Sequence, residues 1–302
     1  MFNEVTTIID QDLCTGCGIC VDVCPLDTIS LQGDKAVVTG NTSLNCGHCM
    51  AACPEEAITV KAIDQSWSMF STFKADHRWM RQGDFDTAQL VRLIASRRSC
   101  RNFKDKPVDR SILEDLVKIG ITAPSGTNCQ LWTFTVLPTR QSVQALAERV
   151  AQFFERLNSM AEKTLLRNFL KLVGKPELDR YYKEYHETVK RALAEAKISG
   201  RDKLFYGAPS LIIVGSKPGA STPKEDCMLA SQNILLAAHS MGLGSCLIGM
   251  AVQAMQNDQS IQRFLGIPKD EKIYAIIALG YPNEAYRAPA GRRQPEIRNF
   301  EG

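Results

Sequence analysis

Helical spacing of apolar residues begins near Asp86 and marks the start of the larger part of the chain. Leu90, Val91 and Ile94 recur at intervals of three and four residues, which places them on one face of a helix. Asp86 stands at the N-cap position and Gln89 at N3, the spacing of a capping box. We therefore predict a helix that begins directly after Asp86.

Further patterns predict a second helix and three strands. Ser111 and Glu114 have capping-box spacing ahead of the second helix. Trp132–Val136 alternates apolar and polar residues, as a half-buried strand does. Leu211–Val214 and Ile273–Leu279 are apolar runs of the length expected for buried strands.

Long helices are predicted for much of the remaining sequence. Residues 140–203 are charged and favour helix, with one clear break at Gly174–Pro176, and a further helix ends at Met241. Long helices combined with a few strands that are not neighbours in the sequence predict an α+β fold.

Length and charge narrow the possible functions. The 302 residues carry 36 basic and 33 acidic side chains, and a net charge of +3 is too balanced to suggest a nucleic-acid partner. No apolar run reaches the length of a membrane span, and the N-terminus lacks the pattern of a secretion signal. We expect a cytoplasmic protein with no nucleic-acid or membrane partner.

Cysteines are concentrated near the N-terminus, in a motif that occurs twice. The pattern C-x2-C-x2-C-x3-C-P begins at Cys14 and recurs 29 positions later, except that the second copy has Ser43 where the first has Cys14. Three thiolates at these gaps can wrap three corners of an iron–sulfur cubane, and the fourth cysteine lies beyond reach of that cluster and binds the other one.

This crossed pattern assigns two sets of ligands. The first cluster takes Cys14, Cys17, Cys20 and Cys53. The second takes Cys24, Cys46, Cys49 and a group at or near Ser43.

Zinc and disulfides are the competing interpretations of these cysteines. Four-thiolate zinc sites also use C-x2-C pairs, but zinc does not explain the third cysteine at the same gap, the proline that follows or the twofold repeat. Disulfides fit less well, because such close spacings without a secretion signal indicate reduced thiols. Residues 1–63 resemble a bacterial two-cluster ferredoxin over their whole length.

Ser43 leaves the state of the second cluster open. Its oxygen is a harder and less acidic ligand than a thiol. Water could occupy the position instead, the cluster could lose one iron and persist as [3Fe–4S], or an intact [4Fe–4S] cubane could remain. In each case we expect this cluster to be the more labile of the two.

Residues 64–84 are interpreted as a connector, and residues 85–302 as a second domain with a helical insertion at about 140–203. Four segments of this domain resemble the FMN-dependent nitroreductase family, in the order in which that family has them. They are Arg97–Phe103, Ala123–Trp132, Gly242–Gly249, and Ala278–Pro282 followed by Arg292 and Arg293.

The resemblance implies an FMN site shared by two subunits of a homodimer. Arg97 and Arg98 both follow the predicted helix and offer guanidinium groups, the best side-chain donors for phosphate. The resemblance assigns the phosphate and ribityl chain to Arg97, Ser99 and one of Arg292 and Arg293. It places Arg101 near the pyrimidine edge of the flavin. Pro124, Ser125, Gly126 and Asn128 would reach FMN from the partner subunit. Leu247, Ile248 and Gly249 would present backbone to the ring, with the Gly249 N–H directed at N5.

The expected function is that of an oxidoreductase that passes electrons from the clusters to FMN and on to an organic acceptor, such as a nitroaromatic or a quinone. A soluble ferredoxin or a similar carrier would supply the electrons, and direct use of NAD(P)H stays open. The alternative is an electron-transfer relay to a partner enzyme. A substrate-sized cavity above the flavin would favour the enzyme, and a sealed flavin edge the relay. No catalytic acid can be assigned.

Overall fold

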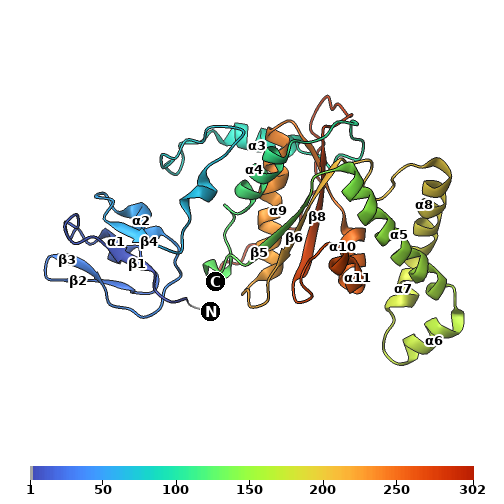
Figure 1. Ribbon diagram of the computed structural model, residues 1–302, viewed down its shortest axis with the longest axis horizontal. Helices are drawn as coiled ribbons and strands as arrows, with labels where there is room; N and C mark the ends of the chain where they lie inside the picture. Colours follow the sequence, from blue (N-terminus) through green and yellow to red (C-terminus); the bar gives the residue numbers. More distant parts are fainter. Residues whose placement is uncertain (1–2) are drawn as a thin grey trace.

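The computed structural model describes residues 3–302. In Figure 1, the first four strands and the first two helices form a small unit, and a connector that contains the 3₁₀ turn Gln65–Ser68 leads from it to a large unit, which surrounds a four-stranded sheet. The strands are β1 (Thr7–Ile9), β2 (Ile29–Gln32), β3 (Lys35–Val38), β4 (Ile58–Val60), β5 (Trp132–Leu137), β6 (Ser210–Ser216), β7 (Gly244–Leu247) and β8 (Lys272–Gly280).

Helices occupy most of the large unit. The helices are α1 (Ile19–Asp22), α2 (His48–Ala52), α3 (Thr87–Ser96), α4 (Arg110–Gly120), α5 (Arg140–Ala161), α6 (Thr164–Leu172), α7 (Glu177–Glu184), α8 (His186–Ser199), α9 (Pro223–Ser240), α10 (Gly249–Asn257) and α11 (Gln259–Phe264), with 3₁₀ turns at Gln65–Ser68 and Gly126–Asn128. Within residues 3–302, none of these helices has both the length and the apolar character needed to cross a membrane.

The small unit preserves the sequence repeat in its backbone. β1 pairs antiparallel with β4, and β2 with β3. α1 and α2 each follow a left-handed glycine, Gly18 (φ 80°) in the first copy and Gly47 (φ 75°) in the second. Gly16 (φ 68°) and Asn45 (φ 49°) are a second pair of equivalent left-handed positions. The two copies therefore share one backbone plan.

The large sheet has the order β5-β6-β8-β7 and is antiparallel throughout. Along β6, Leu211 and Ile213 enter the core shared with α5 and α10, while Ile212 and Val214 enter the core shared with α4 and α9. Figure 1 shows these helices on opposite faces of the sheet. Burial on both faces explains why β6 and β8 are continuous apolar runs. The predicted α+β class is confirmed.

The first predicted helix is confirmed and the second begins earlier than expected. Asp86 caps α3 by accepting hydrogen bonds from Ala88 N (2.8 Å) and Gln89 N (3.2 Å). The capping box assigned to Ser111 and Glu114 is wrong, because α4 begins at Arg110 and Ser111 lies inside it. The Glu114 carboxylate instead accepts from Arg110 Nε at 2.9 Å, one helical turn away.

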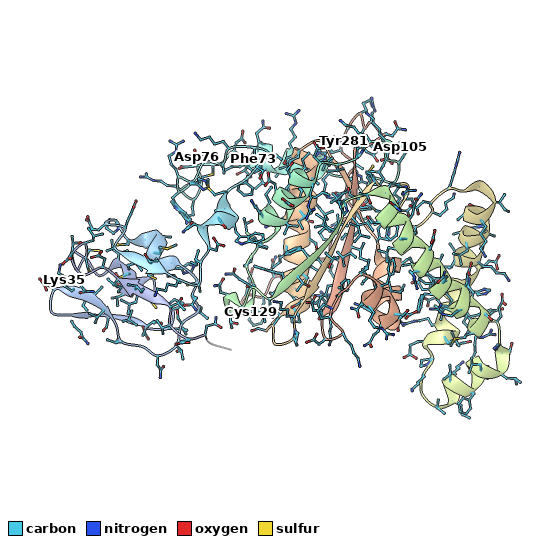
Figure 2. All side chains as sticks on the ribbon, viewed as in Figure 1. Lys35, Phe73, Asp76, Asp105, Cys129 and Tyr281 are labelled. Carbon is cyan, nitrogen blue, oxygen red and sulfur yellow. The ribbon has the colours of Figure 1, made fainter. Side chains whose placement is uncertain are left out.

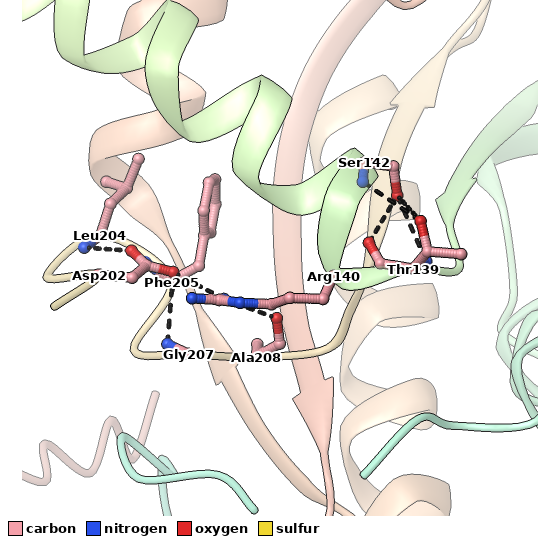
Figure 3. Close-up of polar contacts among 8 residues, drawn as sticks. All are labelled: Thr139, Arg140, Ser142, Asp202, Leu204, Phe205, Gly207 and Ala208. Atoms are coloured by element: carbon pink, nitrogen blue, oxygen red, sulfur yellow. Dashed lines mark hydrogen bonds and ion pairs between the residues drawn. The ribbon is translucent and has the colours of Figure 1, made fainter. Parts of the chain in front are cut away.

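The helical insertion comprises α5 to α8 and turns back at more points than the single predicted break. The Asp202 carboxylate links the segment after α8 to the start of α5 (Figure 3). Asp202 accepts from Leu204 N (3.0 Å), Phe205 N (2.8 Å) and Arg140 NH1 (3.0 Å), and Arg140 also donates to Ala208 O. The start of α5 and the segment before β6 are thereby held together, which closes the insertion into a loop on the large unit.

Candidate functional site

The loop that follows α3 lies directly beside β7. Ser99 forms a parallel bridge with Ser245, and Cys100 N donates to Ser245 O at 2.9 Å. A Cβ on Gly244 would stand 2.7 Å from the Cys100 sulfur, so only glycine permits this approach. Two of the motif segments, residues 97–103 and residues 242–249, are therefore joined in the folded chain.

Arg97, Arg98 and Arg292 form a cluster of positive charge that we call the arginine site. Burial lowers the pKa of Arg97, and the charges of Arg98 and Arg292 lower it further. Within residues 3–302, none of the three guanidinium groups forms an ion pair with a carboxylate. A bound anion would relieve this repulsion, and guanidinium forks match the oxygens of a phosphate. Of the two C-terminal arginines, Arg292 is the one whose charge lowers the pKa of Arg97.

Next to the arginine site, Leu247 and Gly249 are exposed on either side of Ile248, which is buried. Gly249 is the first residue of α10, so its N–H has no partner within the helix. A Cβ placed on Gly249 would meet no atom within 4 Å, and the Leu247 side chain is exposed. Cys246, the preceding residue, lies within Coulombic reach of Arg97 and Arg101. A ligand with a planar ring and a phosphate group could therefore bind here, with the ring against the Gly249 backbone and the phosphate at the arginines.

Two residues beside Arg101 were not found from the sequence. The Arg101 guanidinium stands 5.8 Å from the centre of the Tyr206 ring, and Arg101 N donates to Glu284 Oε1 at 3.1 Å. Tyr206 lies at the end of the helical insertion with φ at 57°. The sequence itself offers only Gly207, the residue after Tyr206, as a sign of a turn at this position.

The motif Pro124–Asn128 lies at the opposite edge of the sheet. It is anchored by Gly126 N, which donates to Asp226 Oδ1 at 2.9 Å, and it leads into β5. From β5 to β7 the separation is three strand spacings, about 14 Å, and the register of Trp132 and Leu247 adds about 17 Å along the strands. Within one chain, the structure does not bring this motif together with the arginine site.

The small unit contains two cavities lined by cysteines. One is lined by Cys14, Cys17, Cys20 and Cys53, and the other by Cys24, Ser43, Cys46 and Cys49. These are the two groups of residues that the crossed motif assigns to separate clusters.

Backbone amides direct hydrogen bonds at the cysteine that each copy contributes to the other's cavity. Thr28 N donates to Cys24 Sγ and Ala57 N to Cys53 Sγ, both at 3.3 Å. Burial would raise the pKa of Cys24, but hydrogen bonds from neighbouring groups, including the Leu26 and Thr28 amides, outweigh it and lower the pKa. Such donors stabilise thiolates, which is the form of cysteine that binds iron.

The thiols of each group lie around the wall of a cavity and are too far apart to bind one metal ion together. Within residues 3–302, no three His, Cys, Asp or Glu side chains come together as a single metal ion would require. Thiols spread around a cavity suit a cubane, whose irons occupy separate corners. The Ser43 hydroxyl lines its cavity, is 8% exposed and accepts a hydrogen bond from Asn45 N at 3.0 Å.

Two family models match separate parts of the chain. The Nitroreductase family model matches residues 94–281, more than half of the sequence. The chain belongs to the nitroreductase family. A 4Fe-4S binding domain model matches residues 7–30, which contain the first copy of the cysteine motif. We refer to the large unit as the nitroreductase domain from here on.

Three curated or solved relatives cover between 65% and 70% of this chain. The 4-nitrobenzoate reductase of Nocardioides sp. (strain LMS-CY) is 26% identical over 223 residues, 68% of this chain and 87% of the relative. The iodotyrosine deiodinase of Thermotoga neapolitana is 26% identical over 199 residues, 65% of this chain and 89% of the relative. A solved nitroreductase with bound FMN from Desulfitobacterium hafniense DCB-2 is 26% identical with a TM-score of 0.50, covering 70% of this chain and 97% of that one.

The nitroreductase domain contains an open cavity of about 660 Å³ between α5 and α8. Its walls include apolar residues of both helices, such as Val150, Phe154 and Leu193. Met250, the residue after Gly249, also lines it. The cavity therefore borders the segment that offers open backbone beside the arginine site.

Proposed function

We propose that the protein is an FMN-dependent reductase that receives electrons through two iron–sulfur clusters and delivers them to a small aromatic acceptor. The observation that carries this proposal is the arginine site: three guanidinium groups that form no ion pair with a carboxylate within residues 3–302, beside the exposed backbone of Gly249. The cysteine-lined cavities of the small unit supply the second part of the argument.

Bound clusters would carry single electrons, and bound FMN would collect two of them for transfer to an organic molecule. The chain's own residues would position these groups. Arg97, Arg98 and Arg292 would hold the phosphate, the Gly249 N–H would donate to the ring, and Arg101 would place positive charge beside it. A soluble ferredoxin or a similar one-electron carrier is the proposed donor.

Two features support a homodimer as the working form. The start of the motif, Pro124–Gly126, and the arginine site lie at opposite sheet edges, so a flavin that contacts both must be bound between two chains. The Asn128 amide is hydrogen-bonded within its own chain, so we do not include it among the flavin contacts. Moreover, Leu90, Val91 and Ile94 of α3 are exposed, as are Met228 and Leu229 of α9, although the pattern of α3 is that of a packed face. A second copy of the chain would cover these apolar side chains.

The cavity beside Met250 favours an enzyme over a relay, because its volume of about 660 Å³ lies within the range of small-molecule sites. The named activities of the two curated relatives concern a nitroaromatic acid and an iodinated phenol. We therefore propose an aromatic acceptor with an electron-withdrawing substituent.

Titration of the apoprotein with FMN tests the proposal. A charge-assisted hydrogen bond contributes about 1.5–3 kcal/mol, so Arg97→Ala should weaken FMN binding about tenfold or more. Arg292→Ala should weaken it by a similar factor, because the charge of Arg292 acts on Arg97. Arg293→Ala is the matched comparison, and we expect it to leave FMN binding nearly unchanged. Unchanged affinity in Arg97→Ala, or no FMN binding by the unaltered protein, would contradict the proposal.

A further inference from the structure

One side chain joins the small unit to the nitroreductase domain by direct hydrogen bonds. Asn128 Nδ2 donates to Leu44 O at 2.9 Å and to Asn45 O at 3.2 Å, and Asn128 Oδ1 accepts from Gln130 Nε2 at 2.9 Å. Both ends of the amide are therefore engaged within the chain. Thr127, Asn128 and Gln130 all have positive φ, and such backbone strain is concentrated at functional positions.

The two residues that Asn128 contacts belong to one of the two cysteine-lined cavities. Leu44 and Asn45 line the cavity of Cys24, Ser43, Cys46 and Cys49, which we call the inner cysteine site. The other, the outer cysteine site, contains Cys14, whose carbonyl accepts from Lys35 Nζ. Figure 2 shows Lys35 at the far end of the small unit, and Cys129, the neighbour of Asn128, on the side of the nitroreductase domain that faces the small unit.

The loop that carries Asn128 lies far from the arginine site of its own chain. As described above, the two are separated by about 14 Å across the sheet and about 17 Å along it. The inner cysteine site thus contacts the nitroreductase domain near the β5 edge of the sheet, whereas the arginine site lies beside the β7 edge. In a twofold dimer, however, the β5 edge of one chain can face the β7 edge of its partner.

We propose that Asn128 fixes the inner cysteine site against the nitroreductase domain of its own chain, and that this site serves the flavin held by the arginines of the partner subunit. This inference rests on the proposed function. Two one-electron oxidations of a reduced carrier protein, with two protons from water, supply what two-electron reduction of one flavin requires. Asn128 is a positioning residue in this arrangement.

Hydrogen exchange of the purified protein tests the role of Asn128. Asn128→Asp keeps the size and the tolerance for positive φ, but it removes the donor. Loss of two hydrogen bonds should accelerate amide exchange at residues 44–46 about tenfold or more. Ser125→Ala, in the same loop, removes only the hydrogen bond from Gln130 N and should leave that exchange unchanged. Unaltered exchange in Asn128→Asp would overturn the docking role.

Mixed dimers with different tags on the two chains test the crossed arrangement. In the first, one chain carries Arg97→Ala and Arg98→Ala, and the other carries Cys46→Ala and Cys49→Ala. In the second, one chain carries all four changes and the other none. Photoreduced soluble ferredoxin is added without oxygen, and loss of the absorbance of oxidised flavin is followed in a single turnover.

The two dimers give opposite results under crossed and same-chain delivery. Crossed delivery predicts that the first dimer reduces its flavin at the per-site rate of the unaltered protein. The second should be as slow as a dimer in which both chains lack Cys46 and Cys49. The reverse result would overturn the crossed arrangement while FMN binding, and with it the proposed function, stands. Equally slow flavin reduction in both dimers would overturn the crossed arrangement and the proposed function together.

Discussion

The two copies of the cysteine motif share a backbone plan but differ in what surrounds them. In the first copy, Gly16 lies beneath the β2–β3 turn, and a Cβ at this position would stand 1.9 Å from Asp34 O. In the second copy, Asn45 takes the equivalent left-handed position, and its side chain contacts Thr6 Oγ1 and Glu4 O. A hairpin encloses the first copy, whereas the N-terminal segment and the nitroreductase domain enclose the second.

The residues that differ between the two copies therefore lie where the second copy contacts the N-terminal segment and the nitroreductase domain. Ser43 replaces the expected cysteine and pairs with Asn3 through its backbone. Asn45 replaces glycine, and its carbonyl accepts from Asn128. The 4Fe-4S binding domain model matches the first copy, residues 7–30. The second copy is therefore the one that contacts the nitroreductase domain through Asn128.

Exchanging the residues at the equivalent left-handed positions should produce the largest effect. Gly16→Asn introduces a Cβ into the Asp34 carbonyl, which a backbone group cannot avoid without moving, and adds left-handed strain. We expect a loss of about 3 kcal/mol or more in the free energy of unfolding, together with loss of iron from the outer cysteine site. Urea denaturation and iron analysis measure these two quantities.

The reverse exchange, Asn45→Gly, is the matched control. Glycine relieves the strain at φ 49° but gives up the contacts with Thr6 and Glu4, so the net change should stay within about 1 kcal/mol. Equal destabilisation by the two exchanges would show that the copies have equivalent surroundings and would remove the basis of the comparison.

The sequence predicted the repeat, the two ligand groups and the nitroreductase segments, because each depends on short-range spacing. It could not predict the contact of Asn128 with Leu44 and Asn45, which joins residues more than 80 positions apart. The start of α4 was misplaced because Ser111 and Asp109 are both good caps, and the choice depends on how the helix packs. Tyr206 and Glu284 were missed since their position depends on the folded insertion and C-terminal segment. Assignment of the cofactor ligands themselves stays a prediction.

Restoring the missing cysteine should have the next largest effect. Ser43→Cys gives the inner cysteine site a fourth thiol, and we expect iron loss to a chelator to slow about tenfold or more, since even indirect ligand partners change metal affinity by that factor. Cys14→Ser is the matched change in the outer cysteine site and should accelerate its iron loss. EPR during chelation distinguishes the two clusters. If neither substitution alters the order of loss, position 43 does not set the difference between the copies.

The smallest expected effect concerns the connector, which attaches the small unit at a second point. Asp115 is buried in α4 and accepts from Ser71 N (3.0 Å) and Thr72 N (2.7 Å). Burial alone would raise the pKa of Asp115, but these hydrogen bonds outweigh it and lower the pKa below its ordinary value of 3.8. The stabilisation is therefore complete near neutral pH and is lost only as the pH falls through that lowered pKa.

Asp115→Asn should weaken this attachment by about 1 kcal/mol, because an amide retains only part of the acceptor capacity of a carboxylate. Trypsin cleavage after Lys74, in the exposed connector, should accelerate about fivefold at neutral pH. If Asn128 docks the inner cysteine site independently, exchange at residues 44–46 should stay at its original rate in this variant. Faster exchange there would mean that the connector positions the second copy, and that its distinct surroundings follow from the connector and not from Asn128.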